Sequence, residues 1–178
     1  MKFEGECSYR TEEDTLFSAT ALADLISCAK KNIRKRSRLC LHDNPLAPCH
    51  QMLITHGCDE YVNPHRHNDK AETFIVLEGS VEFIIFDDQG GVVEVTEMSA
   101  LGSGKPFIKI VDKGVYHSML ITSEWLVFFE ITTGPFRKNA CEFAKWAPSI
   151  GGNEGGINYL RRKTEEYDAN GSKHARRS

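Results

Sequence analysis

The sequence has no excess of positive charge and no long apolar run. Its 178 residues carry 22 Lys and Arg against 25 Asp and Glu, which gives a formal net charge of -3 and a pI of about 6.2. General nucleic-acid-binding proteins usually present a basic field, so this balance argues against one. The longest apolar runs, such as residues 126–129, are far too short to span a bilayer. We therefore expect no nucleic-acid partner and no membrane segment.

A secretory signal is also missing, because residues 1–14 are polar and acidic and contain no apolar core. This predicts a cytoplasmic protein whose six cysteines are free thiols rather than a disulfide framework. Residues 40–58 are rich in Cys and His but contain no pair of CxxC motifs, which argues against a zinc finger. A chain of this length buries a core without disulfides or a structural metal, so any bound metal needs a functional explanation.

The spacing of apolar residues changes from a helical to a strand-like period near residue 39. Residues 12–31 repeat apolar side chains every three or four positions, with acids first and lysines last, which predicts an amphipathic helix. Short β-rich runs then alternate with Gly, Asp and Asn, and no internal repeat is present. They predict strands near 51–56, 60–67, 72–78, 81–87, 92–96, 107–111, 115–121 and 125–131. Short strands at this spacing favour a jelly-roll sandwich or a small barrel.

This pattern divides the single domain into four consecutive parts. We expect an N-terminal helical extension, a barrel, a C-terminal cover and a flexible tail, at 1–38, 39–135, 136–150 and 151–178. The cover includes a stretch at 140–147 that reads as short helical or irregular structure. The tail is predicted to be flexible because it is rich in glycine and charge.

Three histidines and one glutamate have a spacing that suits metal binding. His65 and His67 are two residues apart on a predicted strand, where alternate side chains point to the same face. Glu72 follows across a short polar turn, so a strand reversal brings its carboxylate beside the two imidazoles. His117, on a distant predicted strand, is a candidate fourth ligand. Such a set suits one divalent transition metal, and does not choose among Fe, Mn, Ni, Cu and Zn.

The same residues carry a family resemblance. Two motifs, H-x-H-x4-E-x6-G and G-x2-H, consist of His65, His67, Glu72, Gly79, Gly114 and His117. They resemble the two motifs of the cupin superfamily, although Ile121 stands where that family often has Asn. The resemblance implies an all-β cupin fold, a double-stranded β-helix or jelly-roll barrel, here with an N-terminal helix and a short C-terminal cover segment. It also implies a metal on these histidines and the glutamate, the alternative being a degenerate cupin with an empty cavity.

The flanking segments narrow the resemblance. Residues 38–42, 61–67, 86–90, 128–135 and 143–148 are similar to the WbuC-type cupin-fold metalloproteins. That similarity implies a bound metal and a role in bacterial O-antigen or capsular polysaccharide biosynthesis, without a settled reaction. The wider resemblance to cupins, which frequently pair through their sheets, implies a homodimer. It does not extend to the tail.

Three functions are compatible with such a chain. The leading hypothesis is a metal-dependent enzyme that isomerises or epimerises a sugar or sugar-nucleotide, since a bound metal can polarise a carbonyl or hydroxyl. Glu130 is its candidate catalytic acid or base, with a solvated strand face as the alternative role. The other hypotheses are an iron-dependent dioxygenase and a non-catalytic, metal-dependent carbohydrate-binding protein. The candidate substrate contacts are Arg38, His42, Tyr61 and Tyr116.

The basic segment at 30–38 has two interpretations. It carries six positive charges in nine positions, which suits a nucleotide diphosphate or another anionic group. The other interpretation is a solvated helix end, where cations are favoured by the helix dipole. We prefer the second for the lysines and the first for Arg38, which lies in the family-like part of the segment.

Overall fold

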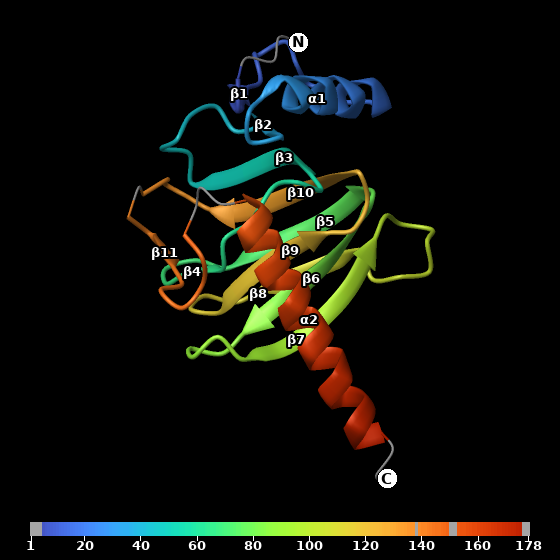
Figure 1. Cartoon of the computed structure of the whole chain (residues 1–178). Coiled ribbons are helices and arrows are strands. Elements are labelled where there is room, and N and C mark those ends of the chain that lie inside the picture. Colours follow the sequence, from blue (N-terminus) through green and yellow to red (C-terminus); the bar gives the residue numbers. More distant parts are fainter. Residues whose placement is uncertain (1–4, 138, 150–152, 176–178) are drawn as a thin grey trace.

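The computed structural model describes residues 5–137, 139–149 and 153–175. In this part of the chain, eleven strands form two facing sheets, and one helix covers the outer face of each sheet (Figure 1). The predicted all-β sandwich with an N-terminal helix is confirmed. Among the described residues, we find no helix that combines the length and the apolar character needed to cross a membrane.

The first sheet has six strands. In spatial order these are β1 (Cys7–Tyr9), β2 (Arg36–Cys40), β3 (Cys49–Gly57), β10 (Trp125–Thr133), β5 (Glu72–Glu78) and β8 (Ile108–Val111). Strand β1 pairs parallel to β2, and the remaining pairs are antiparallel. Neighbouring strands are mostly distant in sequence, so side chains from separate segments share one face.

The second sheet has five strands. In spatial order these are β11 (Cys141–Phe143), β4 (His65–His67), β9 (Tyr116–Ile121), β6 (Ser80–Phe86) and β7 (Val92–Ser99). The two glycines of the cupin-like motifs lie in turns that lead into strands of this sheet, Gly79 before β6 and Gly114 before β9. Gly79 and Gly114 have φ angles of +85° and +81°, which L side chains rarely adopt, and a Cβ at Gly79 would also meet the Trp125 carbonyl oxygen.

The main core lies between the sheets, where alternate residues of each strand point inward. Its buried members include Ile54, Phe74, Val76, Val81, Phe83, Met98, Met119, Leu126 and Phe128. This core fills one end of the sandwich. At the other end the inward-facing positions become polar, and a cavity opens.

Helix α1 (Ala19–Lys31) packs Leu25 against Leu39 and Leu53 on the outer face of the six-stranded sheet. It begins later than the predicted 12–31. The Asp14 carboxylate accepts hydrogen bonds from the backbone and hydroxyl of Thr11, at 3.0 and 2.8 Å. Such local bonds compete with helix formation, and they explain the late start.

Helix α2 (Asn153–Ala175) occupies the segment for which the sequence predicts a flexible tail. Its first half packs Ile157 and Leu160 onto the outer face of the five-stranded sheet, and its second half extends past the strands (Figure 1). Gly156 sits against the ring of Tyr61, where a Cβ would collide. The glycine-rich stretch therefore permits close packing of the helix, which composition alone did not indicate.

Two further segments differ from the sequence prediction. The strand expected at 60–67 is reduced to β4, because Tyr61 turns into the core under α2 and Pro64 has no N–H for a ladder. The cover expected at 140–147 contains β11, which pairs with β4. The sheets therefore extend beyond the predicted barrel 39–135 on both sides, from β1 to β11.

Candidate functional site

A cavity of about 340 Å³ lies between the sheets at their polar end. Its lining comes from both sheets and from the loop before β4. The polar liners are Arg34, Arg36, Arg38, His50, His56, Glu60, Asn63, His65, His67, Lys70, Glu72, His117, Glu130 and Cys141. This volume suits a small ligand of roughly monosaccharide size.

Strand pairing brings the predicted metal ligands together at one end of the cavity. His65 on β4 lies directly opposite His117 on β9, with ring centroids 4.5 Å apart, and His67 lies on the same face of β4 as His65. Glu72 approaches from the facing sheet. Its carboxylate oxygens are 3.2 Å from His67 Nε2 and 3.3 Å from His117 Nε2. The structure thus brings all four predicted ligands into one cluster.

Backbone carbonyls fix two of the imidazoles. His65 Nδ1 donates to the Asn63 carbonyl at 2.8 Å, and His117 Nδ1 donates to the Val115 carbonyl at 3.0 Å. Because a carbonyl only accepts, each Nδ1 carries a proton, which in a neutral imidazole leaves the lone pair on Nε2. His117 Nε2 is buried and has no hydrogen-bond partner among the described residues. Metal-binding histidines commonly have this outer-shell arrangement.

The electrostatics of the cluster also suit a cation. Burial alone would raise the pKa of Glu72, but the His117 and His67 imidazoles beside its carboxylate lower that pKa to about 2. Burial and the neighbouring His117 lower the pKa of His65 to about 3. The carboxyl group is therefore ionised and His65 is neutral at pH 7, the states in which they bind a metal. The residues present fit one divalent ion.

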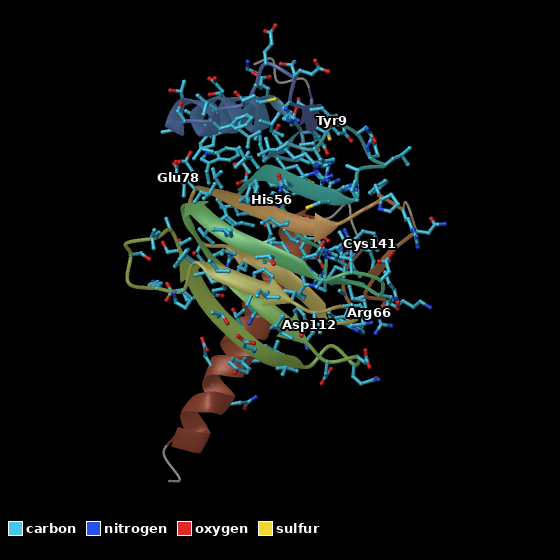
Figure 2. The ribbon with its side chains drawn as sticks, turned by 180° about the vertical axis from the view of Figure 1, so that it is seen from behind. Tyr9, His56, Arg66, Glu78, Asp112 and Cys141 are labelled. Carbon is cyan, nitrogen blue, oxygen red and sulfur yellow. The ribbon has the colours of Figure 1, made fainter. Side chains whose placement is uncertain are left out.

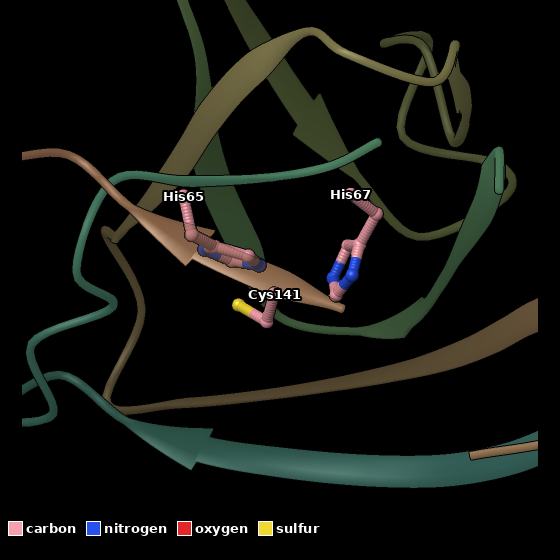
Figure 3. Close-up of side chains that lie close together, drawn as sticks. All are labelled: His65, His67 and Cys141. Carbon is pink, nitrogen blue, oxygen red and sulfur yellow. The ribbon is translucent and has the colours of Figure 1, made fainter. Parts of the chain in front are cut away.

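Cys141 is a fifth candidate ligand that sequence reasoning missed. It faces His67 across the pairing of β11 with β4, and one ligand atom from each of Cys141, His65 and His67 lies within 4.8 Å of the other two. Figure 3 shows the three side chains close together, with Cys141 beside His65. Burial and the Glu72 charge raise the pKa of the Cys141 thiol to about 11. The only sequence signal was a cysteine in the cover segment, because the strand pairing that places it is not local.

Glu130 lines the cavity from β10, on the same face of that strand as Phe128. In the sheet it lies opposite Phe74 of β5, two residues along from Glu72. Burial and the charge of Glu72 raise the pKa of Glu130 to about 7. A carboxyl group with this pKa can either donate or accept a proton near neutral pH.

The predicted substrate contacts are divided between the cavity and its surroundings. Arg38 lines the cavity. Tyr61 also borders it, but its hydroxyl donates to the Pro148 carbonyl at 3.1 Å, so the polar atom is already bonded. His42 and Tyr116 are not among the cavity-lining residues.

Both of these outer side chains have other partners. His42 stacks on His50 with ring centroids 4.1 Å apart. The Tyr116 hydroxyl donates to Glu142, and the Arg66 guanidinium lies 4.4 Å from the centre of the Tyr116 ring. His42, which follows β2, and Tyr116 on β9 therefore lie outside the cavity lining in this structure, and their substrate contacts stay a prediction.

Comparison with known proteins places this geometry in a common fold. A conserved uncharacterized protein with a double-stranded β-helix domain from Klebsiella pneumoniae aligns with a TM-score of 0.53 and 17% identity, over 76% of this chain and 97% of its own. KdgF from Halomonas sp. aligns with a TM-score of 0.45 and 13% identity, over 58% and 82% of the two chains. Oxalate decarboxylase OxdC from Bacillus subtilis gives 0.48 and 16%, over 61% of this chain and 27% of its own.

Sequence comparison adds one match. The model of a family described as a domain of unknown function (DUF6016) matches residues 17–98, a segment that includes three of the four predicted ligands. No curated protein sequence matches the chain. At 17% identity the likeness to the Klebsiella protein establishes the fold alone. The chain therefore has the predicted cupin fold, with a candidate metal centre in the cavity between its sheets.

Proposed function

We propose that the chain is a metal-dependent enzyme that isomerises or epimerises a small sugar or sugar derivative. The observation that carries the proposal is the grouping of three imidazoles and one carboxylate at one end of the cavity. The ligands are His65, His67, Glu72 and His117. A divalent ion held there would supply Lewis-acid polarisation of a carbonyl or hydroxyl oxygen.

The chain's own residues have distinct roles in this proposal. Glu130 is the acid or base that moves a proton on the substrate, because its carboxyl faces the cavity and has a pKa of about 7. Phe74 and Phe128 form the apolar floor beside it and exclude water. Arg38 contacts the substrate from the other end of the cavity.

The sugar assignment is supported by cavity size and by sequence resemblance. A cavity of about 340 Å³ lined with polar groups accommodates one monosaccharide ring. The segments that resemble WbuC-type proteins favour O-antigen or capsular polysaccharide biosynthesis as the setting. We also propose that the chain forms a homodimer, which sedimentation of the purified protein would test.

The first experiment measures the metal. Protein purified without a nickel column is analysed for metals, and the natural chain is compared with a His65→Ala/His67→Ala variant. We expect near-stoichiometric Fe, Mn or Zn in the natural chain and its loss in the variant. An equal metal content in both proteins would overturn the proposed ligand set. No metal in either protein would indicate a degenerate cupin.

The second experiment tests the reaction. Candidate sugars and sugar-nucleotides are incubated with the metal-loaded protein in D2O, and deuterium incorporation at carbon is followed by mass spectrometry. Isomerases and epimerases that move a proton exchange it with solvent, so incorporation that is lost in Glu130→Gln supports the proposal. Oxygen consumption with substrate would favour a dioxygenase instead. Calorimetric binding without any product would favour a carbohydrate-binding protein.

A further inference from the structure

Three arginines line the end of the cavity away from the candidate metal ligands His65, His67 and His117. Arg36 and Arg38 alternate with Ser37 on β2, so both point to the same face of the sheet, and Arg34 precedes the strand. All three line the cavity. The metal proposal does not require such a cluster, and three guanidinium groups beside a ligand cavity need a separate explanation.

Two of the arginines are neutralised within the protein. Glu60 is almost fully buried, and its Oε1 lies 2.9 Å from Arg34 and 3.5 Å from Arg36. Arg36 also pairs with Glu6 at 2.9 Å. These pairs hold both guanidinium groups in place. They preorganise this end of the cavity without filling it.

Arg38 is not neutralised. Its side chain makes no hydrogen bond or ion pair with the described residues, although it is half-buried and lines the cavity. Its charge reaches Glu130, whose pKa it lowers against the larger effects of burial and Glu72. An unpaired guanidinium in a cavity is a planar donor suited to a carboxylate or phosphate.

His56 provides a second, independent indication of a ligand. It lines the cavity from β3, directly opposite Arg36 in the sheet, and only 8% of its surface is exposed. Its Nδ1 is buried and has no hydrogen-bond partner among the described residues. Buried polar atoms of this kind are normally satisfied, so an unsatisfied one at a cavity wall marks a place for a ligand or water. Figure 2 shows His56 on the six-stranded sheet.

The cations around the cavity exceed the ionised carboxylates. Arg34, Arg36, Arg38 and Lys70 face Glu60, Glu72 and Glu130, and Glu6 pairs with Arg36 from outside the lining. Glu130 is partly protonated at pH 7. A divalent ion on the histidine cluster would add further positive charge. The occupied cavity would therefore be cationic, which favours an anionic ligand.

Arg38 and Glu72 rise from strands that are not adjacent. Strands β2 and β5 are separated by β3 and β10, and adjacent strands lie about 4.8 Å apart, so the two backbones are separated by ~14 Å. Their side chains shorten this span. A ligand that contacts both ends therefore needs two separate polar groups.

We propose that Arg38, with His56 beside it, binds the anionic group of a sugar substrate whose hydroxyl or carbonyl oxygens face the histidine cluster. The substrate class is then a monosaccharide that carries a terminal carboxylate or phosphate. This assignment deepens the proposed function and rests on it for the orientation of the substrate. Anion binding at Arg38 itself does not depend on the metal.

The test uses the full chain, freed of metal with a chelator, and titration calorimetry with three matched probes: glucuronate, glucose 6-phosphate and neutral glucose. We expect at least one of the anionic probes to bind about tenfold or more tightly than glucose. The preferred anion distinguishes a carboxylate from a phosphate ligand. Arg38→Gln should remove the preference, Arg38→Lys should retain part of it, and the exposed Arg162→Gln should leave it unchanged.

The comparison of probes on the natural chain needs no variant and remains valid if Arg38→Gln does not fold. Equal binding of glucose and both anions, failure of both anions to bind at millimolar concentration, or an unchanged preference in folded Arg38→Gln would overturn the proposal. The His65→Ala/His67→Ala variant separates it from the proposed function. Loss of metal with retained anion binding is expected, whereas a natural chain that binds anions but no metal would contradict only the proposed function.

Discussion

The two ends of the cavity are built by opposite electrostatic means. At the histidine end the imidazoles of His67 and His117 lie beside a single carboxylate, that of Glu72. At the arginine end the protein provides three cations, and two carboxylates, Glu6 and the buried Glu60, pair with Arg34 and Arg36. At the first end Lys70 lies 3.6 Å from Glu72, whereas at the second end Arg38 has no carboxylate partner among the described residues.

This contrast teaches how one small cavity can orient a substrate. In the proposed arrangement, a metal ion would complete the histidine end and an anionic group would complete the arginine end. Glu130 lies between them on β10, where it is influenced by Glu72 from one side and by Arg38 from the other. A ligand with one anionic end therefore has a preferred direction in the cavity, and its neutral end lies beside the acid or base.

The largest expected effect comes from breaking the histidine end alone. His117→Ala removes a buried ligand, so we expect metal affinity to fall by at least about tenfold while the fold and the anion preference remain. Elemental analysis measures the metal, and circular dichroism checks the fold. Glu97→Gln, an exposed change on β7, is the control. An unchanged metal content in His117→Ala would show that the four-ligand assignment is wrong.

Breaking the charge balance at the arginine end should have the next largest effect. Glu60→Gln leaves Arg34 and Arg36 without their buried carboxylate, which we expect to destabilise the fold by roughly 2–4 kcal/mol. The same change should strengthen anion binding. Denaturant unfolding and calorimetry measure the two quantities. Glu6→Gln, which removes a half-exposed partner of Arg36, should cost less than about 1 kcal/mol. Equal costs for the two changes would contradict the assigned burial of the charge.

The two ends also differ in how far the sequence predicts them. His65, His67 and Glu72 were predicted because a strand alternates its side chains and a single turn returns the chain. Cys141 was not predicted, because it reaches the same point only when β11 pairs with β4. The family-like segment around Arg38 predicted that this residue contacts the substrate. The sequence did not predict that Arg34 pairs with Glu60, or that Arg38 has no such partner among the described residues.

The fold shows the same limit. Strand positions and the helix before the barrel followed from periodicity, because both depend on neighbouring residues. The sequence did not predict helix α2, because a segment rich in glycine is usually flexible. Here Gly156 instead allows the helix to pack closely on the ring of Tyr61. Contacts that depend on distant segments were predictable only where the family resemblance supplied them, as for His117.

The pH dependence of stability tests the arginine end separately. Burial and the neighbouring arginines lower the pKa of His56 to about 3, from an ordinary value of 6.5. Between these values the unfolded chain binds a proton that the native state does not, so stability is lost as the pH falls from 6.5 toward 3. The contribution of one histidine is at most about 1.4 kcal/mol per pH unit.

We therefore expect metal-free His56→Gln to lose less stability than the natural chain when both are acidified from pH 7 to pH 4. Urea unfolding at several pH values measures the difference. The other buried histidines are present in both proteins, so their contributions cancel in this comparison. Parallel pH curves for the two proteins would show that His56 is exposed to protonation in the native state.

The smallest effect is expected at Cys141, which makes the histidine end sensitive to the kind of metal. Its thiol lies within 4.8 Å of the ligand atoms of His65 and His67, yet four other donors suffice to hold an ion. Sulfur ligands favour soft ions, so Cys141→Ser should weaken zinc binding by a few-fold to about tenfold and leave manganese binding nearly unchanged.

The cobalt-loaded natural protein should show a thiolate-to-metal absorption band that Cys141→Ser lacks. Cys58→Ser, at an exposed thiol, should retain the band. Identical spectra for the natural chain and Cys141→Ser would place the thiol outside the coordination sphere, and the histidine end would then discriminate among metals by nitrogen and oxygen donors alone.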